Sequence, residues 1–373
     1  KSCGSSSRVW MGSVCAKRNG APQQSEDIEN MGASCPCLAG LGSKLEPGRG
    51  VFSFPYLPGK PEMRVFYYLP PSGYDPNSEP LFVLHGLKRD GEDYFKEVMN
   101  TGEPERLKVF LMCPEFSKPL FPEVNGYNFG SVFKENPEHY EPEDHDGDIL
   151  PEIRPPKEWA FTCLEECFTQ ALARSPCKSK TYKLFGHSAG AQFVHRFALV
   201  YAVAASAGML PKWRVSEIVS GNSGWYTLPH YPPKDRFPYG LKALDLRIPF
   251  GKSGTAAEEE ITKAYVQAPL TLLLGEHDTD PNKPNPKAWR DSPDPIKTQG
   301  PHRFARGHNF LKVAQDSAKK LGVTCNWQIK TVPGVGHDGA RMSTVALTIL
   351  YDPALGGKVD VGVLKNVKGA AMA

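Results

Sequence analysis

The sequence Thr181-Tyr-Lys-Leu-Phe-Gly-His-Ser-Ala-Gly190 decides the fold of this chain. Residues 181–185 are rich in β-branched and aromatic side chains, which favours a strand, and an apolar-periodic run typical of a helix begins directly after Gly190. A Gly-x-Ser-x-Gly sequence between a strand and a helix is a sharp turn that exposes the serine hydroxyl. The two glycines remove Cβ atoms that so tight a turn would bring into collision. We therefore predict that Ser188 is a nucleophile.

Apolar runs on both sides of this turn predict the remaining strands and helices. We expect an antiparallel opening pair at 51–54 and 63–69, buried strands at 80–86, 108–114 and 269–275, a short strand at 215–220 and a last strand at 326–332. We expect helices at 93–100, 158–174, 255–267, 308–321 and 340–351. This alternation predicts an α/β fold with a mostly parallel central sheet and helices on both faces. Ligands of such sheets bind beyond the carboxyl ends of the strands.

Two long insertions follow strand ends, at 115–156 and 228–254. The first is dense in Pro, Gly, Asn and acidic residues, so it is predicted to be irregular. Loops of this length are usually functional or disordered. We expect the two insertions to determine the substrate.

Composition and charge limit the partners. With 44 Lys and Arg against 41 Asp and Glu, the formal net charge is +3, and no basic cluster is interleaved with aromatics, so nucleic acid is not an expected partner. The sequence contains no run of ~18 apolar residues, so no transmembrane segment is expected. Nothing in the composition indicates the oligomeric state.

The nine cysteines favour reduced thiols. Their number is odd, Cys113 lies in an apolar strand, and Cys163 and Cys167 lie one helical turn apart, which favours a reducing compartment. Cys35-Pro-Cys37 has no second pair at metal-binding spacing, so no metal site is predicted.

We expect three segments: a disordered or processed leader at 1–45, a catalytic domain at 46–352 and a C-terminal tail at 353–373. The leader has few large apolar groups with which to order itself. If Met11 were the start, Gly12 would be placed for myristoylation and Cys15 for palmitoylation, although Ala16 stands where the motif has Ser or Thr. This mismatch favours a leader of no consequence over lipid anchoring at Gly12 and Cys15. The reduced thiols favour an intracellular protein.

A nucleophilic serine needs a general base and an acid that orients that base, and in this strand-turn-helix arrangement the acid precedes the histidine in the chain. His337 follows the last predicted strand, lies among glycines and precedes a helix, so it is our predicted base. The acid is Asp278 or Asp280, both just beyond the strand at 269–275. Asp278 is preferred because it lies closer to the strand end.

Acyl transfer also needs hydrogen-bond donors for the oxyanion. One predicted donor is the backbone N–H of Ala189 at the helix N-terminus, and the second is the N–H of Leu87. His85 and Gly86 precede Leu87 and are predicted to contact substrate, because Gly86 lets the backbone approach it closely. Trp225 lies beyond a strand end, where it either lines the acyl or alcohol pocket or packs under the neighbouring insertion.

Four motifs together resemble those of an α/β-hydrolase: Leu84-His-Gly86, Gly186-His-Ser-Ala-Gly190, Gly275-Glu-His-Asp278 and Gly334-Val-Gly-His337. The sequences around them resemble the polyhydroxybutyrate-depolymerase-like and feruloyl-esterase-like serine esterases: Asn125-Gly-Tyr-Asn-Phe-Gly130, Ser220-Gly-Asn-Ser-Gly-Trp-Tyr226 and Gly300-Pro-His-Arg-Phe-Ala-Arg-Gly-His308. The resemblance covers about residues 51–351.

This resemblance implies the α/β-hydrolase fold and a Ser-His-Asp triad that cleaves carboxylic esters through an acyl-enzyme, without metal or organic cofactor. The substrate would be a small-molecule or polymeric ester. A peptidase, an acyltransferase or a catalytically silent binding protein on the same fold is the alternative. Relatives in this branch are often exported, so secretion is the alternative location.

Overall fold

The computed structural model describes residues 43–138, 150–211, 213–244, 255–281 and 297–352. The predictions for Gly12 and Cys15, for the tail at 353–373 and for nearly all of the leader therefore lie outside the described residues.

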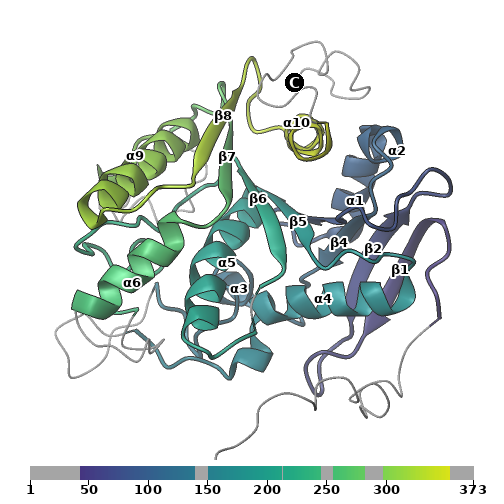
Figure 1. Ribbon diagram of the computed structural model, residues 1–373, viewed down its shortest axis with the longest axis horizontal. Helices are drawn as coiled ribbons and strands as arrows, with labels where there is room; N and C mark the ends of the chain where they lie inside the picture. Colours follow the sequence, from purple (N-terminus) through teal and green to yellow (C-terminus); the bar gives the residue numbers. More distant parts are fainter. Residues whose placement is uncertain (1–42, 139–149, 212, 245–254, 282–296, 353–373) are drawn as a thin grey trace, which may run out of the picture. The chain divides into compact units, whose positions relative to one another are not determined.

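An eight-stranded sheet organises the described chain, with the strand order β1-β2-β4-β3-β5-β6-β7-β8 (Figure 1). The strands are β1 Gly48–Phe54, β2 Met63–Leu69, β3 Leu81–Leu84, β4 Leu111–Glu115, β5 Tyr182–His187, β6 Val215–Gly221, β7 Leu270–Gly275 and β8 Gln328–Val332. Strand β2 pairs antiparallel with both β1 and β4, and the other neighbours are parallel. The predicted sheet and its antiparallel opening pair are confirmed.

The helices are α1 Gly91–Asn100, α2 Glu103–Arg106, α3 Glu123–Tyr127, α4 Ala160–Arg174, α5 Ala189–Ser206, α6 Thr255–Val266, α9 Arg303–Leu321 and α10 Gly339–Tyr351, with a 3-10 turn at Pro156–Glu158. None of the helices in the described part of the chain has the length and apolarity needed to cross a membrane. The described cysteines, Cys113, Cys163, Cys167, Cys177 and Cys325, are free thiols.

Helices lie on both faces of the sheet (Figure 1), and a buried apolar cluster lies on each face. Leu81 and Val83 of β3 pack with α1 and α10, whereas Phe82 and Leu84 pack with α4, α5, α6 and α9. Alternate side chains of a strand point to opposite faces, so a strand covered on both sides must be apolar throughout. This explains the uninterrupted apolar run from which β3 is predicted.

Helix α9 begins at Arg303, five residues earlier than predicted. His302 caps it, because its Nδ1 accepts a hydrogen bond of 3.2 Å from the backbone N–H of Ala305. Histidine is not among the preferred N-cap residues, and the cap is therefore not recognisable from the sequence.

The first insertion is less irregular than predicted. Its described part contains α3, and Phe116, Phe121, Tyr127 and Phe129 are fully buried in the core on the α5 side. The second insertion also reaches this core, through Leu228, Phe237, Leu241 and Leu244. Both insertions therefore supply core packing as well as surface. Residues 139–149 and 245–254 lie outside the described chain.

Candidate active site

Ser188 lies in the sharp turn between β5 and α5, with φ 58° and ψ −113°. A residue other than glycine rarely adopts this conformation, and the surrounding contacts must hold it. A Cβ on Gly186 would lie 2.2 Å from the carbonyl oxygen of Gly190, and one on Gly190 would lie 2.3 Å from that of Leu84. The two glycines are thus required by close backbone approach, as the motif predicts.

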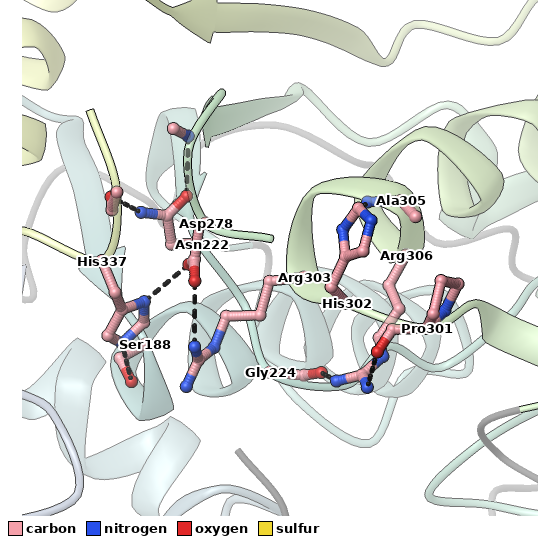
Figure 2. Close-up of polar contacts among 12 residues, drawn as sticks. Ser188, Asn222, Gly224, Asp278, Pro301, His302, Arg303, Ala305, Arg306 and His337 are labelled. Atoms are coloured by element: carbon pink, nitrogen blue, oxygen red, sulfur yellow. Dashed lines mark hydrogen bonds and ion pairs between the residues drawn. The ribbon is translucent and has the colours of Figure 1, made fainter. Parts of the chain in front are cut away.

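Ser188, His337 and Asp278 lie in one hydrogen-bonded chain at the carboxyl ends of β5, β8 and β7 (Figure 2). Nε2 of His337 is 3.0 Å from Oγ of Ser188, and Nδ1 is 2.7 Å from Oδ2 of Asp278. A carboxylate only accepts, so Nδ1–H donates to it and leaves Nε2 free to accept from the serine hydroxyl. The arrangement can remove a proton from Ser188.

Asp278 is 4% exposed and binds a second cationic group. Nη1 of Arg303, at the start of α9, donates to Oδ1 of Asp278 over 3.0 Å. Burial by itself raises the pKa of Asp278, but the hydrogen bond from His337 and the charges of His337 and Arg303 outweigh it and bring that pKa below its usual value. Asp280 is exposed, so the geometry favours Asp278 of the two predicted acids.

Asn222, just after β6, ties the loops of β7 and β8 together. Its Oδ1 accepts from the N–H of Gly275 over 2.8 Å, and its Nδ2 donates to the carbonyl of Gly336 over 3.0 Å. The loops that carry Asp278 and His337 are therefore joined through one side chain (Figure 2).

The loop after β3 holds the second group of predicted residues. Leu87 is 65% exposed, whereas Ala189 is buried at the first position of α5. Within the described part of the chain, neither backbone N–H donates a hydrogen bond. Both N–H groups are thus available to an acceptor.

A cavity of about 270 Å³ lies beside Ser188, between α1 and the start of α10. Its lining consists of Gly86, Leu87, Lys88, Arg89, Asp90, Asp93, Tyr94, Glu97, His187, Ser188, His337 and Gly339. In the described chain, no three His, Cys, Asp or Glu side chains are grouped so that they could hold a metal ion.

Comparison with solved structures assigns the fold family. Poly(aspartic acid) hydrolase-1 from Sphingomonas sp. KT-1 is 31% identical over 83% of this chain and 100% of its own, with a TM-score of 0.64. This chain belongs to the α/β-hydrolase superfamily. The poly(3-hydroxybutyrate) depolymerase LpqC from Bordetella parapertussis is 27% identical over 86% of this α/β-hydrolase and 94% of its own chain, also with a TM-score of 0.64. No protein-family model matches, and no curated protein sequence is significantly similar.

Both of these relatives are, by name, enzymes that cleave polymers, and we conclude that this α/β-hydrolase is a hydrolase in activity as well as in fold. The predicted fold class and the predicted resemblance to polyhydroxybutyrate depolymerases are confirmed.

His85 has a different place from the one predicted. It is 1% exposed and is not part of the cavity wall. The N–H of Phe116 donates to its Nε2 over 3.1 Å, and the hydroxyl of Tyr127 donates to its backbone carbonyl over 2.6 Å. Burial lowers the pKa of His85 to about 4, so the ring is neutral near pH 7. His85 is therefore a buried residue that supports the loop after β3, which carries Leu87.

Arg89 is a residue of the cavity wall that was not predicted from the sequence. Its φ is 64°, and its buried guanidinium donates to four backbone carbonyls of the first insertion. The acceptors are Phe116, Ser117, Phe121 and Glu123. This side chain fastens the insertion to the loop that carries Leu87.

Trp225 is 2% exposed and is not part of the cavity wall, so the packed position fits it and the pocket position does not. The guanidinium of Arg306 lies 3.8 Å from the centre of its ring. Arg306 also donates to the carbonyls of Gly224 and Pro301 (Figure 2). Its Nε donates to the carbonyl of Gly300. Trp225 thus helps to join the strand end of β6 to the start of α9.

Arg303 and Asn222 were not predicted as site residues. Both lie in sequence blocks that carry the resemblance to the esterases, 300–308 and 220–226. That resemblance is the signal that could have identified them.

Proposed function

We propose that this hydrolase cleaves carboxylic esters through an acyl-enzyme intermediate. Ser188 attacks the ester carbonyl while His337 takes its proton, and His337 then returns the proton to the departing alcohol. Water then attacks the acyl-enzyme while His337 takes a proton from it, and His337 returns this proton to Ser188 as the acid leaves. Asp278 orients His337 and stabilises the imidazolium that forms.

The observation that carries this proposal is the chain of contacts through His337, with 3.0 Å to Oγ of Ser188 and 2.7 Å to Oδ2 of Asp278. The first distance allows proton transfer from Ser188 to His337 without rearrangement, and the second is a hydrogen bond that holds the imidazole in place. The backbone N–H groups of Leu87 and Ala189 are the proposed donors to the oxyanion. Loss of one such donor typically costs 10²- to 10³-fold in turnover.

The second relative supports an ester as the substrate, because its name gives poly(3-hydroxybutyrate) as the polymer that it cleaves. The first relative is named for poly(aspartic acid), and cleavage of that polymer is the second candidate activity. The three carboxylates in the cavity wall, Asp90, Asp93 and Glu97, would repel a polyanion, so we place the ester first.

Turnover of p-nitrophenyl esters of increasing chain length tests the proposal, with Ser188→Ala as the matched variant and poly(aspartic acid) as a second substrate. We expect ester turnover by the wild type and its loss in the variant. Labelling by a fluorophosphonate should likewise require Ser188. A folded protein that neither turns over esters nor takes the label would instead be a binding protein on this fold.

A further inference from the structure

One end of the cavity beside Ser188 contains a buried polar side chain that has no role in the proposed mechanism. His187 is 6% exposed and is part of the cavity wall, and its ring centre lies 4.6 Å from that of His337. Its Nε2 is buried and has no hydrogen-bond partner in the described chain. Unpartnered polar atoms at such depth are uncommon. The ring reaches the cavity through its other nitrogen, Nδ1, which lies beside Gly339 of the cavity wall.

Gly339 leaves room for the Glu97 carboxylate beside this histidine. A Cβ on Gly339 would lie 3.5 Å from Nδ1 of His187 and 2.4 Å from Oε1 of Glu97. The two polar atoms therefore converge on the space above Gly339. Glu97, on α1, forms no hydrogen bond or salt bridge within the described part of the chain.

The charges around this space are mainly negative. Asp90 and Asp93 of the same wall precede Glu97 in the chain. Partial burial, and after it the charge of Asp338, raise the pKa of Glu97. Lys88 and Arg89 are the cations of this wall, and Lys88 lowers the pKa of Glu97. The guanidinium of Arg89 is directed at backbone carbonyls of the first insertion. Burial keeps the pKa of His187 well below its usual value, so its ring adds no charge near pH 7.

A neutral His187 can carry its proton on Nδ1 or on Nε2. A buried N–H without an acceptor is rarer than a buried acceptor without a donor, which favours the proton on Nδ1. Nδ1–H then points a donor at the space above Gly339, and the Glu97 carboxylate points an acceptor at it.

We propose that this end of the cavity is a substrate subsite that holds a hydrogen-bond donor group, a hydroxyl or an ammonium, and rejects a carboxylate. The inference rests on the proposed ester hydrolysis at Ser188. A hydroxyl satisfies both Glu97 and His187, and an ammonium gains the charge of Glu97. A carboxylate would face the same charge in a partly desolvated place.

Two matched series of esters test the subsite. The first keeps p-nitrophenol as the alcohol and varies the acid: hexanoic, 6-hydroxyhexanoic, 6-aminohexanoic and adipic acid. The second keeps acetate as the acid and varies a phenol that carries methyl, hydroxymethyl, aminomethyl or carboxyl. In at least one series, we expect kcat/KM for the hydroxyl and ammonium esters to exceed that for the carboxylate ester on the order of tenfold at low salt.

Glu97→Gln removes the charge and keeps the shape, so it should reduce the ammonium-to-carboxylate ratio on the order of tenfold. Gly339→Ala should shift the ratio in the same direction, because its methyl group displaces Oε1 of Glu97. Glu92→Gln is the matched control: Glu92 lies on the same helix, pairs with Lys96 over 2.7 Å and is not part of the cavity wall. This control should leave the ratio unchanged.

The two proposals fail separately. If hexanoate and acetate esters are cleaved but neither series shows a charge preference that Glu97→Gln removes, the subsite is wrong and the hydrolase activity stands. If no neutral ester is cleaved in either series, the proposed function is wrong, and the subsite proposal falls with it.

Discussion

Arg303 and Asp278 form a buried ion pair, with 3.0 Å between Nη1 and Oδ1, and the other oxygen of the same carboxylate binds His337. Both side chains of the ion pair are almost fully buried, with 6% and 3% exposed. Asp278 therefore has one oxygen committed to an arginine and one to the candidate base. Its rotation about the side-chain bonds is fixed from both sides.

Replacing Arg303 should impair turnover more than substrate binding. Arg303→Met leaves Asp278 buried with one cationic partner fewer, so we expect kcat on a p-nitrophenyl ester to fall about 10- to 100-fold with KM changed less than threefold. Arg303→Lys keeps the charge and should recover part of the loss. Unfolding curves establish that each variant is folded. A folded Arg303→Met with near-normal kcat would exclude this positioning role.

Asp278 and Asp280 should differ sharply on replacement. Asp278→Asn keeps the volume but removes the acceptor that holds His337 in its reactive tautomer, so we expect kcat to fall on the order of 10³- to 10⁴-fold. Asp280→Asn, at an exposed position two residues away, should stay within twofold. Equal losses in the two variants would mean that the acid has been assigned to the wrong residue.

The sequence predicts the residues that lie directly after strand ends, because there the order along the chain determines the position in space. Ser188, Asp278 and His337 each follow a strand of a parallel sheet, and such ends meet along one edge. The sharp turn at Ser188 also requires glycine locally, and this Gly-x-Ser-x-Gly motif can be recognised in the sequence.

The supporting arginines could not be predicted in this way. Arg89 binds carbonyls of residues 116–123, and Arg303 binds a carboxylate 25 positions away, so neither pairing has a characteristic spacing. Backbone carbonyls are present at every residue and give no sequence signal. The sequence likewise could not decide whether Trp225 lines the pocket or packs under the insertion. Its partner Arg306 comes from a different element, so the contact has no characteristic spacing.

Acid should destabilise the protein through His85. Its pKa is about 4 in the folded chain and about 6.5 when unfolded, so the unfolded state binds the proton first as pH falls. The stability is therefore complete above pH 6.5 and is lost progressively between pH 6.5 and 4, by about 3 kcal/mol. Urea denaturation at pH 7.0, 5.5 and 4.5 measures this loss.

His85→Gln is the matched variant for this pH dependence. The glutamine amide can accept from the N–H of Phe116 without titrating, so its stability should fall less steeply between pH 6.5 and 4. The slope will not vanish, because burial also lowers the pKa of His187 and His195. Parallel curves for the wild type and the variant would show that His85 is not responsible.

Arg89 should couple the first insertion to the proposed oxyanion donor. Its guanidinium binds four carbonyls of residues 116–123, and its own backbone lies two residues after Leu87. Arg89→Met leaves these buried carbonyls without donors, which should cost about 2 to 4 kcal/mol of stability and lower kcat by allowing the N–H of Leu87 to move. Arg89→Lys can donate to fewer of the carbonyls than arginine, so its stability and kcat should lie between those of the wild type and of Arg89→Met.

Measuring kcat under conditions where Arg89→Met is fully folded distinguishes support of the loop from general destabilisation. At a temperature where urea denaturation shows Arg89→Met fully folded, kcat should still be reduced, and limited proteolysis should cut the variant within residues 116–123 sooner than the wild type. Arg174→Met is a suitable control, because Arg174 is also buried and donates to a backbone carbonyl, that of Ser53, away from the cavity. It should lose stability without a comparable loss of kcat in the folded protein. Equal effects of the two variants on kcat would contradict a specific role for Arg89.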